Sequence, residues 1–465
     1  MVRSSVFLHR PLSDSFKRFF FIPTSSLILI TCFTIFLSIY STSLFLTSHH
    51  QQLKQLEIDD PQYNQSQQIL IAQPDQTLNN TVSNNDGYGS DAATQYERLL
   101  QSLGDKEVFH DKYTFHDNYK EMKKSFKIYV YPHKKDDPYA HALLPVDFEP
   151  GGNYASESYF KKNLMQSHFI TKDPSEADLF FLPFSIARLR HDSRIGVGGI
   201  QDFVKSYVYN ISQKYPYWNR SGGADHFYVA CHSIGRSAME KAEEVKFNTI
   251  QVVCSSSYFL SGYVAHKDAC LPQIWPRQGD PPNVDLSNRK RLAFFAGAVN
   301  SPVRKKVLEA WKNDTDIFVN SGRLATPYSD QLLGSKYCLH VKGFEVNTAR
   351  IGDAIYYGCV PVIIANHYDL PFADILDWKS FSIVVATLDI PKLKEILLGV
   401  NSMEYKILQR NVVEVQKHFQ WNIIPKDYDI FYMVMYELWL RRSPLTFSSS
   451  EFLGLDEQYT NSGVR

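Results

Sequence analysis

The segment from residue 342 to residue 365 carries charged side chains at spacings that suit the binding of an anion. It reads KGFEVNTARIGDAIYYGCVPVIIA and contains Glu345, Arg350 and Asp353. Arg350 and Asp353 are three residues apart and would share one face of a helix. An arginine in the first turn of a helix is disfavoured by the helix dipole, which indicates an anionic partner. A phosphate at the helix N-terminus would be such a partner, and Asp353 could accept both hydroxyls of a ribose.

The place of this segment in the predicted fold also favours a ligand site. YCLHV (337–341) is predicted as a strand, and the loop with Glu345 follows its carboxyl end, where parallel α/β sheets bind ligands. Asn347 or Thr348 could cap the helix that follows. The alternative is a plain salt bridge between Arg350 and Asp353 on a solvated helix face, and the spacing alone leaves both interpretations open.

The elements that must position these residues alternate from about residue 125 onwards, which indicates parallel sheets covered on both faces. A loop rich in Pro, Gly and charge at 273–291 separates two such runs. The pattern predicts two Rossmann-like domains, 125–285 and 286–442, that face a cleft. Strands are predicted at 127–131, 178–184, 226–230, 249–254, 291–297, 316–320, 337–341, 359–364 and 381–385, and helices near 154–165, 198–213, 236–245, 302–312, 390–398, 402–419 and 427–440.

The N-terminal region has the pattern of a membrane anchor. No Asp, Glu, Lys, Arg or His occurs from Phe19 to Ser48, a length sufficient to cross a bilayer. Four basic residues precede this run, which predicts a cytosolic N-terminus and a lumenal body. A cleaved signal peptide is the alternative, but the run is too long and no A-x-A site follows. We therefore predict a cytosolic tail at 1–18, a transmembrane signal-anchor at 19–48, a stem rich in Gln, Asn and Ser at 49–124, and a flexible tail at 443–465.

Composition narrows the possible partners. The chain has 49 Lys+Arg and 49 Asp+Glu, so a nucleic-acid partner has no electrostatic support. The aromatic content of 14% fits either sugar stacking or a large core. Cys338 and Cys359 begin two predicted strands, so they could form a disulfide or remain two buried thiols. Five N-x-S/T sequons predict glycosylation in a lumenal compartment, at Asn64, Asn79, Asn210, Asn219 and Asn313.

Several stretches, in order along the body, resemble the exostosin family of glycosyltransferases, especially its plant cell-wall members. They are YASESYF, PSEADLFFLPF, GGADHFYVACH, LAFFAG, SPVRKKVLEAW, SKYCLHVKGFEVNTARIGDAIYYGCVPVIIANHYDLPF and WKSFSIVV. The resemblance implies an α/β protein of the GT-B type, a single-pass type II protein of the Golgi membrane with its body in the lumen. It also implies an inverting transfer from a nucleotide sugar, bound mainly by the C-terminal domain, with no obligatory metal or cofactor.

The resemblance also implies roles for residues of the donor site. Asp353 stands where the family has a glutamate and would hold the ribose, while Arg350 and Arg304 would neutralise the diphosphate. Glu345 would hold sugar hydroxyls or position its loop, which begins at Gly343. Fixed arginines suit this reaction, because negative charge develops on the departing nucleotide diphosphate.

An inverting displacement also needs a base for the proton of the acceptor hydroxyl. Glu157 in YASESYF is the first candidate, since it should begin a helix and face the cleft. Asp225, His226 and His232 in GGADHFYVACH are alternatives, although such groups commonly make structural hydrogen bonds.

Two positions depart from the pattern of the relatives. Ser233 replaces an acid in the CHDW motif, and Gln273 replaces an acid that follows a proline. Both positions belong to the predicted acceptor-side domain, so they put the acceptor in doubt and should leave donor binding intact.

The sequence therefore predicts a transferase that moves a sugar from a UDP-linked donor to pectin, hemicellulose or a related glycan. Its predicted partners are that glycan, the Golgi membrane and other glycosyltransferases. The alternative is a non-catalytic Golgi partner that stabilises another glycosyltransferase. The two departures from the motifs suggest it, and the joint presence of Glu345, Arg350 and Asp353 argues against it.

Overall fold

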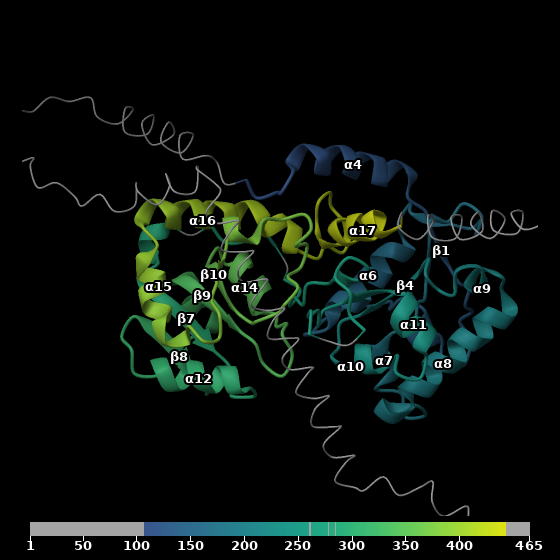
Figure 1. Cartoon of the computed structure of the whole chain (residues 1–465), viewed down its shortest axis with the longest axis horizontal. Helices are drawn as coiled ribbons and strands as arrows, with labels where there is room; N and C mark the ends of the chain where they lie inside the picture. The colour runs from purple at the N-terminus through teal and green to yellow at the C-terminus, as the bar shows by residue number, and fades with distance from the viewer. Residues whose placement is uncertain (1–106, 260–261, 278, 284, 443–465) are drawn as a thin grey trace, which may run out of the picture. The chain divides into compact units, whose positions relative to one another are not determined.

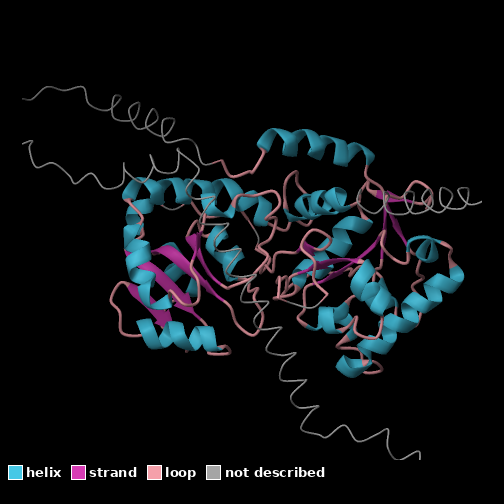
Figure 2. Ribbon diagram, in the orientation of Figure 1, coloured by secondary structure: helices cyan, strands magenta, loops and turns pink. Residues whose placement is uncertain are grey.

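The computed structural model contains two parallel β-sheets with helices packed around them (Figures 1 and 2). The residues that the structure describes are 107–259, 262–277, 279–283 and 285–442. The predicted anchor at 19–48, the tail at 443–465 and the sequons at Asn64 and Asn79 lie outside these ranges. Among the described residues, no helix is both long and apolar enough to cross a membrane.

The first sheet, in the N-terminal half, has the strand order β2-β1-β3-β4-β5-β6, with every neighbouring pair parallel. Its central strands are buried along their whole length, which explains their continuous apolar sequences. The edge strands β2 and β6 were not predicted, because two residues show no periodicity. The bounds are β1 (Ile128–Val130), β2 (Ile170–Thr171), β3 (Leu179–Phe181), β4 (His226–Ala230), β5 (Ile250–Val253) and β6 (Ala269–Cys270).

The second sheet, in the C-terminal half, has the order β11-β10-β9-β7-β8 and is also parallel throughout. All five of its strands were predicted, and their ends differ by only a few residues. They are β7 (Arg291–Ala296), β8 (Ile317–Asn320), β9 (Ser335–Val341), β10 (Val360–Ile364) and β11 (Ile383–Val384).

In each sheet, the strand that comes second in the sequence pairs with one side of the first strand. The third strand pairs with the other side of the first, and the later strands follow it in order. This flavodoxin-like order creates a switch point between β1 and β3 in the first sheet and between β7 and β9 in the second. Ligands bind beyond the carboxyl ends of the strands at such points. The loops after β7 and β9 are therefore the expected binding loops of the C-terminal half.

Helices of regular amphipathic pattern cover the sheets (Figure 1). The longest, α8, buries Ile200, Val204 and Tyr207 on one face, at the spacing of a helix that packs on a core. In the N-terminal half the helices are α5 (Ala140–Leu143), α6 (Ala155–Met165), α7 (Ile186–Leu189), α8 (Gly196–Lys214), α9 (Tyr217–Ser221), α10 (Ile234–Ser237) and α11 (Glu243–Asn248). In the C-terminal half they are α12 (Pro302–Trp311), α13 (Tyr328–Leu333), α14 (Arg350–Tyr356), α15 (Leu393–Gly399) and α16 (Ser402–Val415).

Two further helices change the predicted domain limits. Helix α4 (Lys112–Ser125) lies inside the predicted stem, yet Asp111 caps it and its apolar face is buried. It packs on α17 (Ile430–Arg441), which in turn contacts α6 and β6 of the N-terminal half. The predicted stem, 49–124, therefore overlaps a folded helix, and α17 packs on the N-terminal half as well as on the domain predicted at 286–442. Helix α17 is apolar on almost all sides, so it needs cover from more than one element.

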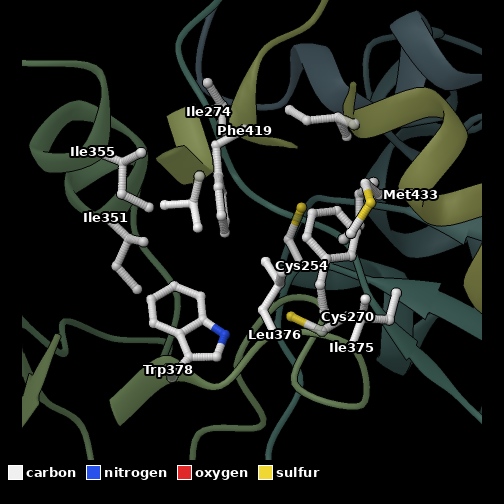
Figure 3. Close-up of a cluster of buried hydrophobic side chains, with 14 of the residues drawn as sticks. Cys254, Cys270, Ile274, Ile351, Ile355, Ile375, Leu376, Trp378, Phe419 and Met433 are labelled. Carbon is white, nitrogen blue, oxygen red and sulfur yellow. The ribbon is translucent and has the colours of Figure 1, made fainter. Parts of the chain in front are cut away.

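The two halves share one buried hydrophobic cluster (Figure 3). Ile351 and Ile355 of α14 belong to it together with Ile274, which lies in the loop between the sheets. The contact is close, because a Cβ added to Gly352 would lie 2.9 Å from Ile274. This packing holds α14 in a defined position, and α14 carries two of the predicted donor residues.

Two disulfides join neighbouring strands. Cys338 of β9 is bonded to Cys359, which directly precedes β10, as the predicted pairing allowed. Cys231 is bonded to Cys254, and this bond links the carboxyl ends of β4 and β5. Cys270 is a buried free thiol. The second bond was not predicted, because the sequence does not show that β4 and β5 are neighbours.

Candidate functional site

A pocket of 650 Å³ lies beyond the carboxyl ends of the strands and receives residues from both halves of the structure. This volume is typical of small-molecule sites. All five predicted donor residues line it, namely Arg304, Gly343, Glu345, Arg350 and Asp353. The other lining residues are Asn153, Tyr154, Ser233, Gln273, Trp275, Pro276, Arg277, Asn300, Tyr328, Phe344, Asn347, Thr348 and Ala349.

The switch point of the second sheet explains why these residues meet. Asn300 and Arg304 follow β7, and Gly343 and Glu345 follow β9. Because β7 and β9 are adjacent and the chain leaves them in opposite directions, their two loops open a crevice between them. Sequences more than 40 residues apart thus reach the same pocket.

Arg304 and Arg350 form the positive part of the pocket. The Arg304 Nε donates to the carbonyl of Val341 (3.2 Å), and the Arg350 Nη2 donates to the carbonyl of Ala296 (2.7 Å). Burial and the neighbouring Arg350 guanidinium lower the pKa of Arg304 to about 10. Within the described part of the chain, neither guanidinium forms an ion pair with a carboxylate. Two close guanidinium groups that backbone carbonyls orient, and that no carboxylate neutralises, suit an anionic ligand with two charged groups.

Asp353 pairs with an arginine that the sequence did not single out. Its Oδ1 accepts from the Arg277 Nη2 at 2.5 Å, and only 5% of the residue is exposed. Burial raises the pKa of Asp353, and the Arg277 guanidinium opposes this rise. The alternative of an Arg350–Asp353 salt bridge on a solvated face is therefore wrong, since α14 is buried from Ile351 to Ile355. Arg277 was missed because it lies in the loop that was interpreted as a domain linker.

The loop after β9 is held by contacts on both sides. The Ser255 hydroxyl, beyond β5 of the N-terminal half, donates to the Glu345 carboxylate. His340 is buried in β9, and its Nε2 lies 2.8 Å from the carbonyl of Val346. Thr348 Oγ1 accepts from the backbone N–H of Arg350 at 3.2 Å, so Thr348 rather than Asn347 satisfies the start of α14. These contacts position the charged residues before any ligand arrives.

Asn347 lines the pocket, and one of its side-chain atoms is an unsatisfied acceptor. Its Nδ2 donates to Gln273 Oε1 at 2.7 Å, while its Oδ1 is buried and has no hydrogen-bond partner within the described residues. Buried polar atoms are rarely left unpaired, so this oxygen is an unusual feature of the pocket wall. Gln273, one of the two departures from the relatives, thus touches the predicted donor loop, whereas the sequence assigned it to the acceptor side alone. The other departure, Ser233, also lines the pocket.

Glu157 does not face the cleft, so its prediction as the catalytic base is wrong. Only 2% of the residue is exposed, and it does not line the pocket. Its Oε1 accepts from the Ser185 hydroxyl and from the Ala187 N–H, and its Oε2 accepts from the Cys231 N–H at 3.2 Å. The first turn of α6 packs inward, so the carboxylate satisfies the loops that follow β3 and β4. Burial raises its pKa, and these hydrogen bonds oppose the rise.

Asp225 lies at the wrong end of its strand for a catalytic base. It precedes β4, whereas the pocket lies beyond the carboxyl ends. Burial opposes its ionisation, but hydrogen bonds from His226, Ser221 and Arg220 lower its pKa to about 2. His226 is itself buried, and its Nε2 lies 2.7 Å from the hydroxyl of Tyr131. Both residues are structural, because a parallel sheet directs its ligand site to the other end.

His232 follows β4 at the carboxyl end and lies behind the pocket wall. Its ring packs on the pocket residue Tyr154, with ring centroids 4.4 Å apart, and Arg190 contacts its Nε2. Burial and the Arg190 guanidinium lower the pKa of His232 to about 4, which leaves the ring neutral. Of the predicted bases, His232 is the one adjacent to the pocket, and its catalytic role stays a prediction.

The three described sequons lie at exposed asparagines, as glycosylation requires. They are Asn210 in α8, Asn219 in α9 and Asn313 after α12. Modification of these side chains stays a prediction.

Two flavodoxin-like α/β halves that contribute to one arginine-rich pocket have the architecture of the GT-B fold. The chain belongs to the exostosin family, because the Exostosin GT47 domain matches residues 122–400. It is 38% identical over 348 residues to a probable glycosyltransferase of Arabidopsis thaliana, in a match that covers 72% of this chain and 64% of that protein.

A second probable glycosyltransferase of the same plant is 36% identical over 373 residues, which cover 76% of this chain and 77% of that protein. A probable glucuronoxylan glucuronosyltransferase of Arabidopsis is 26% identical over 361 residues, or 71% of this chain and 76% of that protein. The chain is a glycosyltransferase of this family, and nothing in the comparisons favours a non-catalytic partner.

Proposed function

We propose that the pocket binds a nucleoside diphosphate sugar, with uridine as the nucleoside, and transfers the sugar with inversion to a cell-wall polysaccharide. The observation that carries this proposal is the pair Arg304 and Arg350, which line the pocket without a carboxylate partner among the described residues. A diphosphate supplies the two adjacent negative groups that such a pair can bind in a bidentate manner. The same guanidinium groups would stabilise the charge that develops on the leaving diphosphate.

The remaining pocket residues fit the other parts of such a donor. The Asp353 Oδ1 accepts a hydrogen bond from Arg277, and Oδ2 can then accept from a ribose hydroxyl. The Glu345 carboxylate can accept from sugar hydroxyls. Phe344, with 81% of its surface exposed, offers an apolar face at the pocket for a sugar ring.

The family supports a wall polysaccharide as the acceptor. Relatives include a probable glucuronoxylan glucuronosyltransferase and a probable beta-1,4-xylosyltransferase of Arabidopsis. We propose a xylan-type or pectic acceptor for this chain as well. The charge-free run at 19–48 further supports anchoring in the Golgi membrane, with the body in the lumen.

A melting experiment with nucleotides tests the donor proposal on the full chain. UDP should raise the melting temperature by about 5 °C at a concentration about 100-fold above its dissociation constant. UMP should shift it less, and uridine should leave it unchanged, because the arginines bind the phosphates. Equal shifts with UDP and uridine, or no shift with UDP, would contradict the proposal. A panel of UDP-sugars, followed by the release of UDP, would then identify the sugar.

Replacing Gly343 should weaken donor binding without unfolding the protein. In Gly343→Ala the new Cβ would lie 2.9 Å from the Arg304 Nη2 and 3.0 Å from the Asn300 Oδ1. Arg304 cannot yield freely, because backbone carbonyls hold its Nε and Nη1. We expect UDP affinity to fall about tenfold, equivalent to one misplaced charge-assisted contact.

Gly322→Ala is the matched control for this change. Its added Cβ would meet only the Asn320 Oδ1, at 3.7 Å, which is an ordinary contact. Isothermal titration of UDP should show wild-type affinity for Gly322→Ala and reduced affinity for Gly343→Ala. Unchanged affinity in both variants would show that the position of Arg304 does not matter for the nucleotide.

A further inference from the structure

A second groove, of 660 Å³, lies on the N-terminal half in the segment that follows β3. The segment IARLRHDSR (186–194) supplies most of its wall. Like the donor pocket, the groove lies near a switch point, here between β1 and β3. Its lining residues are His141, Arg188, His191, Asp192, Ser193 and Arg194.

The groove has more positive charge than its single acid can balance. Asp192 is already engaged, because it accepts from Arg194 at 2.6 Å and lies 3.2 Å from the His141 Nε2. Arg188 forms no ion pair within the described part of the chain. Its guanidinium instead lies 5.6 Å from the centre of the Phe148 ring, and 58% of Phe148 is exposed. An exposed aromatic face thus lies beside an arginine whose charge is not neutralised.

Two side chains connect the groove segment to the wall of the donor pocket. Arg190, in the groove segment, contacts the Nε2 of His232. The His232 ring packs on Tyr154, and both Tyr154 and the neighbouring Ser233 line the donor pocket. A chain that occupies the groove would therefore lead toward the place where the sugar is transferred.

We propose that this groove binds the acceptor, and that the acceptor is a glycan that carries carboxylates on uronic acid residues. The inference rests on the proposed function and narrows the proposed acceptor to a glycan with uronic acid residues. The Arg188 guanidinium can bind a uronate carboxylate through two parallel hydrogen bonds. Phe148 beside it offers its ring to the apolar face of the same sugar. A neutral glycan would leave the positive charge of Arg188 unused.

Binding of three oligosaccharides of equal length to the full chain tests this inference. They are a de-esterified oligogalacturonide, its fully methyl-esterified form and a neutral xylo-oligosaccharide. The de-esterified form should bind about tenfold more tightly than the other two at low salt, as expected for one charge-assisted pair. This preference should shrink as the salt concentration rises, because exposed charges are screened.

Arg188→Gln should lower the affinity for the de-esterified oligosaccharide about tenfold and leave the other two unchanged. Lys205→Glu is the control, since Lys205 is exposed on α8 and lines neither pocket. The melting temperature of each variant, and its shift with UDP, show that the fold and the donor pocket are intact.

Equal affinity for the three oligosaccharides, or an Arg188→Gln variant that still prefers the de-esterified form, would overturn the inference. In that case a normal UDP shift would leave the donor proposal standing. Absence of the UDP shift in the wild type would instead contradict the donor proposal, whatever the oligosaccharides do.

Discussion

Arg350→Ala is expected to abolish the UDP-induced melting shift and to lower kcat/KM for sugar transfer by about 10²- to 10³-fold. The guanidinium lies in the donor pocket next to Arg304 and is oriented by two hydrogen bonds to the Ala296 carbonyl. Its removal leaves Arg304 alone to bind two phosphates. The other cation that lines the described pocket, Arg277, is already paired with Asp353. Both the affinity for UDP and the rate of sugar transfer should fall. The rate is affected because the leaving diphosphate gains negative charge during transfer.

Two further variants separate the role of charge from that of geometry at this position. Arg350→Lys keeps the charge but loses the planar fork, so it should recover only part of the UDP shift. Arg323→Ala removes an exposed arginine of the same half that does not line the pocket, and it should behave as wild type. A full UDP shift in Arg350→Ala would show that the nucleotide binds elsewhere.

Glu157→Ala is expected to destabilise the fold by about 3–5 kcal/mol, as the removal of a buried charged hydrogen-bonding group does. The change leaves the Ser185 hydroxyl and the N–H groups of Ala187 and Cys231 without their acceptor. Buried Lys161 also loses the carboxylate that favours its charged form, although burial already lowers its pKa to about 7. The melting temperature should therefore fall by about 10 °C, which calorimetry of the full chain can measure.

Glu157→Gln distinguishes this structural role from a catalytic one. The amide keeps the size of the side chain and one acceptor oxygen, so most of the protein should stay folded and active. Loss of transfer in a folded Glu157→Gln variant would instead restore Glu157 as the base. Glu309→Ala is the control for the removal of a carboxylate, since Glu309 is exposed on α12 and its weak ion pair contributes at most about 1 kcal/mol.

Local sequence pattern was sufficient for most of the fold. Buried parallel strands such as HFYVA and VPVII are continuous apolar runs, and helices such as α12 begin at a recognisable cap, here Ser301. The helix α4 was missed because its pattern of three buried residues lies in a polar sequence beside a stem-like region. Helix α17 covers α4 with residues more than 300 positions away in the sequence, which no local pattern can show.

The five predicted donor residues line one pocket because they lie in the loops after β7 and β9 or in the first turns of the helices that follow. The base candidates Glu157 and Asp225 could not be judged in this way. Both are acids near strand ends, and only the packing shows that Glu157 turns inward and that Asp225 lies at the amino end of β4. Arg277 shows the opposite case, since it lies in a loop without any periodic signal and reaches Asp353 only after the chain folds.

The sequence by itself determined the alternation of strands and helices, the family, and the residue types that line the pocket, since each depends on neighbours within a few turns of chain. The tertiary structure alone decided which charges pair and which do not. Asp353 is paired with Arg277, whereas Arg304 and Arg350 are held by backbone carbonyls. The physical reason is that the ability to bind an anion depends on the uncompensated charge in a small volume. The strand order brings the residues that carry this charge into one pocket from segments that lie far apart in the sequence.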